Sequence, residues 1–201
     1  MNLFAPDPSL NLLPRDGEVI YHGPVLSPDE ASRCFDVLKA EVPWRNDEVV
    51  IFGKRMVTAR KVAWYGDSAF AYTYSGTTRH ALPWTSELLR LKATVEAIAG
   101  ASFNSCLINL YHHGEEGMSW HCDDEPTLVR GATIASVSLG AERKFAFKHK
   151  REPGLTISIV LEHGSLLLMK GATQEHWLHA LPKTKRVSAP RINLTFRSMV
   201  Q

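Results

Sequence analysis

From residue 102 onward, apolar and polar residues alternate in short runs, and Gly, Pro and charged residues separate one run from the next. This alternation is typical of β-strands, because successive side chains of a strand point to opposite faces. The runs are "FNSCLINLY", "ATIASVSLG", "RKFAFKHK", "LTISIVLE", "GSLLLMKG", "EHWLHALP" and "RINLTFRSM". The pattern predicts about seven or more strands in the second half of the chain.

The first half contains two patterns with the helical period. Ser27 fits an N-cap, Pro28 fits the first helical position, and Glu30 completes an S-x-x-E capping box. We therefore predict a helix over about 28–40. The segment "WTSELLRLKATVEAIAG" predicts a second helix that ends at Gly100. The apolar residues that share one face of this helix are Leu88, Leu91, Val95 and Ile98.

The remaining segments of the first half are β-like or irregular. "DEVVIFGKRMVTARKVAWYG" predicts a strand, a tight turn at "FGK" and a second strand, and "AYTYSG" predicts another short strand. Residues 1–24 are rich in Pro, Asp and Asn, and we expect a flexible lead-in that ends in the short strand "EVIYHG". Helices followed by a strand-rich region at 101–201 suit an α+β chain with a barrel or jelly-roll core.

Composition and charge narrow the class of protein. The chain has 201 residues, of which 44% are hydrophobic and 22% are charged, an ordinary globular balance. The net charge of +2 permits a polyanionic partner without requiring one. The three scattered cysteines argue against a disulfide framework. We see neither a signal peptide nor an apolar run long enough for a membrane span. We therefore expect a cytoplasmic protein, or a nuclear one in a eukaryote, with no membrane partner.

Candidate metal ligands lie in two short segments of the second half of the chain. In "SWHCDD", His121 and Asp123 are two residues apart and share a face if the segment is extended. In "HWLHALP", either His176 or His179 is a candidate third ligand. Two histidines and one carboxylate form the facial triad that binds non-haem Fe(II) and leaves coordination positions open for oxygen and a co-substrate. Closed structural zinc sites offer no such positions.

A second polar set lies on the alternating strand "RINLTFR". Arg191, Asn193 and Arg197 share one face of this strand, and Ile192 belongs to the opposite, apolar face. One interpretation is a surface strand with its arginines in water. The other is a barrel strand whose polar face points inward, where two arginines require an anion such as a dicarboxylate. Asn109 and Tyr111 form a further pair on one face of "INLY".

These motifs together resemble the AlkB family of Fe(II)- and 2-oxoglutarate-dependent dioxygenases. "HCD", a distant His and "RINLTFR" carry the resemblance, which covers roughly 45–199. It is strongest to members that repair DNA, through "IFGK", "YTYSG", "HCDDE", "IASVSLGAERKFAFKHK" and "HGSLLLMKG". The resemblance implies a double-stranded β-helix (jelly-roll) core in 101–201 and N-terminal helices with a nucleotide-recognition lid in 25–100. Both parts belong to one integrated catalytic domain.

The resemblance also implies roles for individual residues and three cofactors or co-substrates, Fe(II), 2-oxoglutarate and O2. The residues that match the iron ligands are His121, Asp123 and His179. The residues that match the 2-oxoglutarate pocket are Asn109, Tyr111, Arg191, Asn193 and Arg197. The residues that match contacts to the target base or to DNA are Phe52, Tyr72, Tyr74, Ser75 and Glu125. Under this assignment His176 is a structural histidine.

The function implied is oxidative demethylation of N1-methyladenine and N3-methylcytosine in single- or double-stranded DNA, which releases formaldehyde, succinate and CO2. We expect a monomer that flips the target base out of the stack. Three basic clusters are candidates for phosphate contacts. Their members are Lys54, Arg55, Arg60 and Lys61; Arg143, Lys144, Lys148, Lys150 and Arg151; and Lys183, Lys185 and Arg186. The alternatives are the same chemistry on RNA or protein, and a non-catalytic nucleic-acid-binding module with a vestigial iron site.

Overall fold

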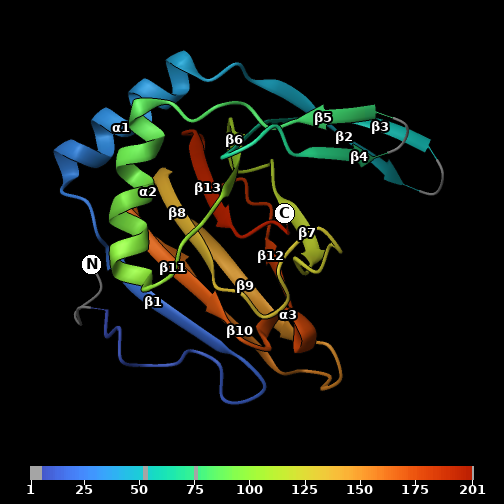
Figure 1. Cartoon of the computed structure of the whole chain (residues 1–201). Coiled ribbons are helices and arrows are strands. Elements are labelled where there is room, and N and C mark those ends of the chain that lie inside the picture. The colour runs from blue at the N-terminus through green and yellow to red at the C-terminus, as the bar shows by residue number, and fades with distance from the viewer. Residues whose placement is uncertain (1–5, 52–53, 75–76, 201) are drawn as a thin grey trace.

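Two β-sheets pack face to face and form the body of the protein (Figure 1). The computed structural model describes residues 6–51, 54–74 and 77–200. In spatial order, the larger sheet contains β1 (Glu18–Pro24), β11 (Ser165–Lys170), β8 (Ile134–Gly140), β13 (Arg191–Arg197), β6 (Ser105–Tyr111), β3 (Lys54–Gly66) and β2 (Arg45–Ile51). The smaller sheet contains β10 (Thr156–Leu161), β9 (Arg143–His149), β12 (Trp177–Leu181) and β7 (Met118–His121). This architecture confirms the predicted α+β fold with a jelly-roll core.

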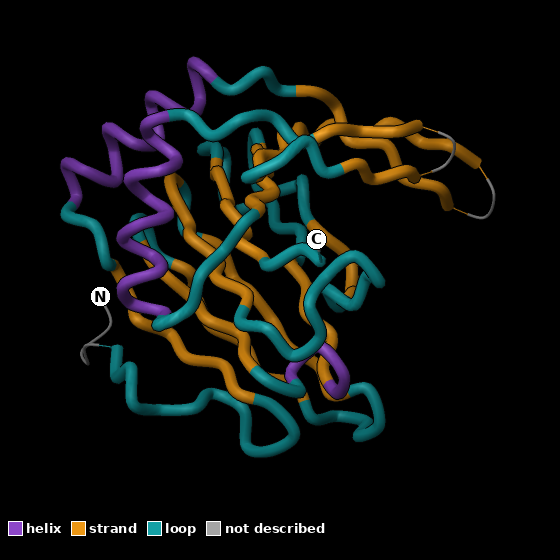
Figure 2. Tube along the Cα trace, viewed as in Figure 1, coloured by secondary structure: helices purple, strands orange, loops and turns teal. Residues whose placement is uncertain are grey.

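Helices α1 (Pro28–Glu41) and α2 (Ser86–Ala99) cover the outer face of the larger sheet (Figure 2). The predicted capping box is present, because the Ser27 hydroxyl accepts a hydrogen bond from the Glu30 amide and the Glu30 carboxylate accepts one from the Ser27 amide. Gly100 ends α2 in the left-handed conformation, as predicted. Ile98 was wrongly placed in the core: it is 36% exposed, because it lies about 80° around the axis from Leu88, at the edge of the apolar stripe.

The alternation of β13 separates the helix-facing core from the interior of the jelly roll. Ile192, Leu194 and Phe196 are fully buried beneath the two helices. Arg191 and Arg197, on the opposite parity, therefore point between the two sheets. The inward interpretation of the polar face is thus the correct one, and a surface strand is excluded.

The N-terminal segment differs from expectation. Leu13, in the segment expected to be a flexible lead-in, is 2% exposed and packs with Trp177 in a second core between the sheets. The indole of Trp177 also donates a hydrogen bond to the Arg15 carbonyl. Burial of apolar side chains holds this segment against the body. Strands β1, β2 and β3 extend the larger sheet beyond the eight strands β6–β13, which form the two four-stranded layers of the jelly roll.

An arm projects from the body on the side of β7 (Figures 1 and 2). We define the arm as β4 (Ala71–Tyr74), β5 (Thr77–His80) and the distal parts of β2 and β3, residues 48–51 and 54–57. A bulge lies at its base, where β3 runs from Lys61 to Val57 while β2 runs only from Asn46 to Glu48. Bulges bend a strand and re-aim its side chains, and they are common beside active sites.

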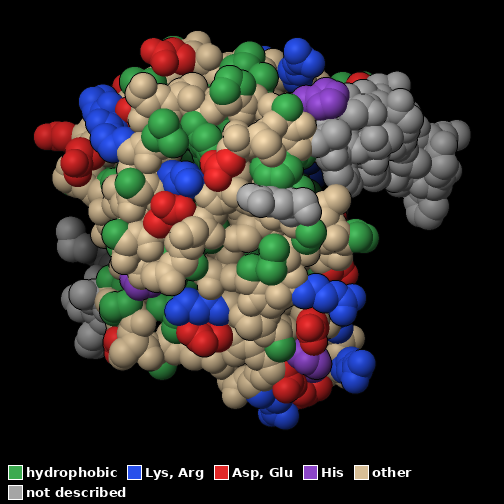
Figure 3. Space-filling view, viewed as in Figure 1, with side chains coloured by type: hydrophobic (Ala, Val, Ile, Leu, Met, Phe, Trp, Pro, Cys, Tyr) green, Lys and Arg blue, Asp and Glu red, His purple; other side chains and the backbone are tan. Residues whose placement is uncertain are grey.

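Surface features add little to the functional argument. Basic and acidic side chains are interspersed on the face shown in Figure 3, as the small net charge leads one to expect. Within residues 6–51, 54–74 and 77–200, no helix is both long enough and apolar enough to cross a membrane. Three short elements were not predicted: β5, β7 and the helix α3 (Thr173–His176).

Candidate metal and co-substrate site

Two neighbouring strands of the smaller sheet bring the predicted metal ligands together. His121 of β7 and His179 of β12 are direct register partners, and the centroids of their rings are 4.3 Å apart. One ligand atom from each of His121, Asp123 and His179 lies within 4.8 Å of the other two. His176 lies outside this group, and its ring stacks on His149 with the centroids 6.2 Å apart. The geometry therefore favours His179 over His176 as the third ligand.

Neighbouring groups orient each of these side chains. Nδ1 of His121 lies 2.8 Å from the Ser119 carbonyl, so Nδ1 carries the proton and Nε2 is the free ligand atom. Nη2 of Arg197 lies 2.8 Å from Oδ1 of Asp123. The Asp123 amide donates a hydrogen bond to the Gln174 side chain, which fixes the backbone between the two ligands. Such outer contacts are typical of metal centres, where they hold the ligands in the geometry that the ion requires.

Burial and a neighbouring guanidinium set the charges of His179 and Asp123. Burial lowers the pKa of His179 to about 3, so its imidazole is neutral at pH 7. Burial alone would raise the pKa of Asp123, but the neighbouring positive charge, above all that of Arg197, outweighs it and holds this pKa below its ordinary value. A buried carboxylate and neutral imidazole nitrogens are the forms that bind a metal ion. The donor set fits Fe(II) with open coordination positions.

The predicted co-substrate residues lie on β6 and β13, which pair Tyr111 with Arg191 and Asn109 with Asn193. Arg191 is 2% exposed and donates a hydrogen bond to the Ser138 hydroxyl, 2.9 Å away. Burial lowers the pKa of Arg191 to about 10, which leaves it charged at pH 7. Within the described part of the chain, Arg191 forms no ion pair and its Nε atom has no hydrogen-bond partner. A buried guanidinium that is charged and has no ion-pair partner is suited to bind a carboxylate of 2-oxoglutarate.

Asn109 and Asn193 differ in the use of their side chains. Oδ1 of Asn109 is buried and has no hydrogen-bond partner among the described residues, so this side chain is available to a ligand. Asn193 is already engaged, because its amide donates hydrogen bonds to the Ser136 hydroxyl and the Val137 carbonyl. The Asn193 side chain therefore links β13 to β8, and its amide group is already hydrogen-bonded within the protein rather than available to the co-substrate.

A cavity of about 850 Å³ opens over the metal ligands. His121, Asp123, Asn109 and Arg197 lie in its wall, whereas Tyr111 and Arg191 are not part of the lining and lie deeper between the sheets. The base of the arm supplies further wall residues, among them Asp47. The metal ligands are thus reached through a cleft bounded by the arm.

The predicted base-binding residues are only partly described. Glu125 lies in the cavity wall, and its Oε1 atom is 4.0 Å from Nη1 of Arg197. Tyr72 and Tyr74 belong to β4, opposite β5, which places them on the arm. Phe52 and Ser75 lie outside the described residues.

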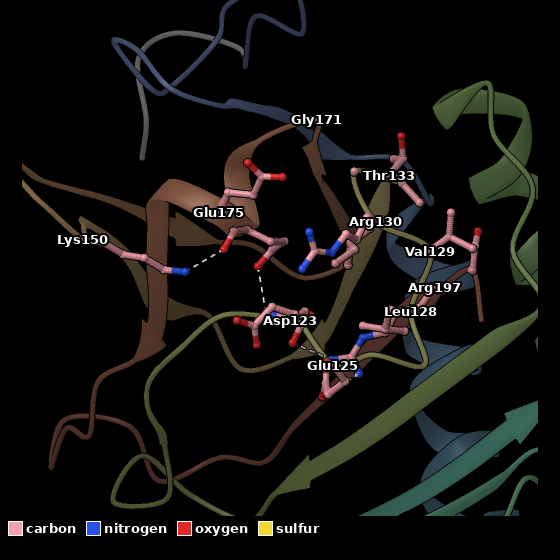
Figure 4. A pocket seen from close by; sticks show the side chains of 16 residues that line it. Asp123, Glu125, Leu128, Val129, Arg130, Thr133, Lys150, Gly171, Glu175 and Arg197 are labelled. Carbon is pink, nitrogen blue, oxygen red and sulfur yellow. Dashed lines mark hydrogen bonds and ion pairs between the residues drawn. The ribbon is translucent and has the colours of Figure 1, made fainter. Parts of the chain in front are cut away.

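A smaller cavity of about 230 Å³ shares Asp123 and Glu125 with the wall of the larger one (Figure 4). Its wall includes Lys150, whose Nζ atom donates hydrogen bonds to the Gln174 carbonyl and to Sγ of Cys122. Cys122 thus contacts Lys150 and is not part of the ligand group, although it lies between two ligands in the sequence.

Two arginines of the predicted basic clusters are buried and unavailable to phosphates. Arg143 is 2% exposed and donates hydrogen bonds to four carbonyls, those of His113, Gly114, Glu116 and Pro182. Arg60 is 6% exposed and forms an ion pair with Asp47 in the cavity wall. The burial of Arg143 could have been predicted from strand alternation, because Arg143 shares a face of its strand with the apolar residues Phe145 and Phe147.

A jelly roll that encloses two histidines, a carboxylate and an unpaired arginine defines a non-haem iron oxygenase with a carboxylate co-substrate. The chain belongs to the 2OG-Fe(II) oxygenase superfamily, whose family model matches residues 17–197. Its cofactor and co-substrates are therefore Fe(II), 2-oxoglutarate and O2, as predicted.

Three relatives confirm the predicted resemblance to the AlkB family. DNA oxidative demethylase ALKBH2 is 42% identical over 181 residues in both Bos taurus and Homo sapiens, which covers 85% of this chain and 65% and 69% of those proteins. The alpha-ketoglutarate-dependent dioxygenase alkB homolog 3 of Bos taurus is 41% identical over 179 residues, 85% of this chain and 62% of that protein. The solved structure of OsALKBH1 shares the fold with a TM-score of 0.62 at 16% identity, over 92% of this chain and 98% of that chain.

Proposed function

We propose that the protein demethylates alkylated bases in DNA, with N1-methyladenine and N3-methylcytosine as substrates. The observation that carries the proposal is the group His121, Asp123 and His179, of which the last two are buried, at a cavity that the arm borders. The relatives named DNA oxidative demethylase support DNA as the substrate class. The chain spans about two thirds of the length of these relatives, so the activity of the whole protein is part of the proposal.

The overall reaction balances with one 2-oxoglutarate and one O2 per methyl group. A methylated base, 2-oxoglutarate and O2 give the unmodified base, formaldehyde, succinate and CO2. Bound Fe(II) with 2-oxoglutarate supplies the oxidising power for hydroxylation of the methyl carbon. In this proposal His121, Asp123 and His179 hold the iron, and Arg191 with Tyr111 holds the distal carboxylate of 2-oxoglutarate. Arg197 keeps Asp123 ionised and oriented through its 2.8 Å contact.

The negative charge of Glu125 and the position of the ligand group inside the jelly roll determine which substrates suit the site. N1-methyladenine and N3-methylcytosine are cationic, and the Glu125 carboxylate in the cavity wall suits a cationic ring. The ligand group lies inside the jelly roll, so a base of duplex DNA must leave the stack to reach it. We assign Tyr72, Tyr74 and Ser75 to contacts with the flipped base. Phe52, in the turn predicted at "FGK", is assigned to the gap that the base leaves in the duplex.

One copy of the chain supplies every residue of this site, so a monomer suffices for the reaction. We propose a monomer that acts in the compartment that holds the DNA, the nucleus of a eukaryote or the cytoplasm of a bacterium.

The test is an assay for succinate and formaldehyde with methylated and unmethylated oligonucleotides, in the presence of Fe(II) and 2-oxoglutarate. We expect both products to appear in equal amounts, and only with methylated strands. His179→Ala should be inactive, and His176→Ala is the matched control that should retain activity. Succinate release that ignores the methyl group, or release without formaldehyde, would overturn the proposal.

A further inference from the structure

Arg60 connects the base of the arm to the interior of the jelly roll. Its guanidinium forms an ion pair with Asp47 of β2, and its Nη1 atom lies 3.1 Å from Sδ of Met118 on β7. Arg60 itself belongs to β3, so one side chain contacts strands from both sheets. The residue is 6% exposed, and its Nε atom has no hydrogen-bond partner among the residues that the structure describes. A buried charge with these contacts has few alternative positions.

The ring of Tyr111 lies next to two guanidiniums. Cζ of Arg60 lies 6.0 Å from the ring centroid, and Cζ of Arg191 lies 5.5 Å from it. Both distances are within the range of cation–π contacts. Arg60, Tyr111 and Arg191 therefore form a continuous line of contacts from the arm to the arginine assigned to 2-oxoglutarate.

The position of Arg60 follows from the bulge at the base of the arm. Between Lys61 and Val57, β3 contains more residues than the paired segment of β2, and Arg60 lies within this stretch. The side chain of Asn46 donates a hydrogen bond to the Thr58 carbonyl, and the Thr58 hydroxyl donates one to the Arg60 carbonyl. The bulge turns Arg60 into the cavity wall at the point where the arm leaves the sheet.

We propose that Arg60 is a positioning residue that couples 2-oxoglutarate binding to the placement of the arm over the metal site. A carboxylate bound by Arg191 and Tyr111 restricts the Tyr111 ring, and the ring restricts the guanidinium of Arg60. Arg60 then holds β2 through Asp47. The inference rests on the role proposed for Arg191 and Tyr111. By thermodynamic reciprocity, an arm held by DNA must in turn strengthen the binding of 2-oxoglutarate.

Amide hydrogen exchange of β2 and β3 tests the coupling without any DNA. The protein is loaded with Mn(II) in place of Fe(II), so that no turnover occurs, and exchange is measured with and without 2-oxoglutarate. We expect 2-oxoglutarate to slow exchange in the arm of the wild type by about fivefold or more, the lower end of typical coupling. In Arg60→Met this protection should disappear, while calorimetry still detects saturable binding of 2-oxoglutarate.

Two further variants separate coupling from a merely structural role. Arg60→Lys keeps a charge beside Asp47 but lacks the planar group that lies against the Tyr111 ring. We expect Lys not to restore the protection, whereas a residue needed only as a partner for Asp47 would be replaced well by Lys. If Arg60→Met does not fold, the same hydrogen-exchange comparison is made with Arg60→Lys alone. Lys61→Met removes the neighbouring charge, which is not in the cavity wall, and should leave the protection unchanged.

The outcomes distinguish this inference from the proposed function. Protection that persists in Arg60→Met or Arg60→Lys, or that is absent from the wild type despite 2-oxoglutarate binding, overturns the coupling and leaves the demethylase assay unaffected. A wild type that shows the protection but releases no formaldehyde from methylated DNA overturns the proposed function alone. In the Mn(II) protein, 2-oxoglutarate should also tighten the binding of a labelled methylated duplex by about fivefold in the wild type, and should have no effect in Arg60→Met.

Discussion

Replacement of Arg191 by methionine should separate 2-oxoglutarate binding from the stability of the fold. Methionine retains much of the apolar volume of arginine and removes the charge. Arg191 is 2% exposed and forms no ion pair with the residues that the structure describes, so its guanidinium is buried without an anion until a ligand supplies one. Without 2-oxoglutarate the variant loses the hydrogen bond to the Ser138 hydroxyl and the contact with the Tyr111 ring, whereas in the complex it also loses the ion pair with the carboxylate.

The expected loss of affinity follows from the contact that disappears. A bidentate, charge-assisted pair of hydrogen bonds in a buried site contributes about 2–4 kcal/mol, mostly because the carboxylate is otherwise left unpaired. This range corresponds to a Kd for 2-oxoglutarate that is weaker by about 30- to 1000-fold. The free energy of unfolding without 2-oxoglutarate should not fall, because an apolar side chain of similar volume replaces an unpaired buried charge.

Calorimetric titration of the Mn(II) protein with 2-oxoglutarate measures the Kd, and urea unfolding measures the stability. Arg143→Met is the comparison, since Arg143 is also buried but donates to four backbone carbonyls. Its loss should cost about 3 kcal/mol of stability or more, because the carbonyls lose their donors. A Kd for Arg191→Met within threefold of the wild type would refute the reasoning, as would a loss of stability as large as that of Arg143→Met.

The remaining predictions concern the ligand group and the hairpin tip. His121→Ala, Asp123→Ala and His179→Ala should each abolish iron binding and turnover, and iron content with product release measures both; a dead His176→Ala with an active His179→Ala would contradict the assignment. Phe52→Ala should lower activity on methylated duplex DNA by about ten- to a hundredfold, or about 1.4–2.8 kcal/mol, and activity on single strands by only a few fold; equal losses on both substrates would exclude a wedge. Burial lowers the pKa of His179 from 6.5 to about 3, so the unfolded chain takes up this proton more readily than the folded metal-free protein. His179 therefore leaves the free energy of unfolding of the metal-free protein undiminished above pH 6.5, and this free energy decreases as the pH falls towards 3. Urea unfolding of metal-free His179→Gln should show a weaker decrease over this range.

Local periodicity predicted the strands and helices where an element was long enough to show it. The alternation of β13 and the capping box at Ser27 are both determined by neighbours in the sequence, and both are present. β7 and α3 contain four residues each, which is too short for a period to appear. Leu13 was misjudged because its partner Trp177 is distant in the sequence.

Only some residues of the candidate site could be predicted from the sequence. His121 and Asp123 are close in sequence, but the pairing of His121 with His179 depends on the register of β7 and β12, which no spacing reveals. The resemblance to a family chose His179 over His176. The burial of Arg60 was missed because its partner Asp47 lies across a bulge, and periodicity does not predict where strand pairing shifts.

The conversion of the methylated base itself is the most direct test of the account. A duplex oligonucleotide with one N1-methyladenine is incubated with the protein, Fe(II) and 2-oxoglutarate in air, and the strand is then digested and analysed by mass spectrometry. The account predicts that adenine replaces N1-methyladenine with one succinate formed per base restored, and that Asp123→Ala leaves the methylated base intact. Unchanged N1-methyladenine in the presence of the iron-loaded wild-type protein and continuing succinate formation would contradict it.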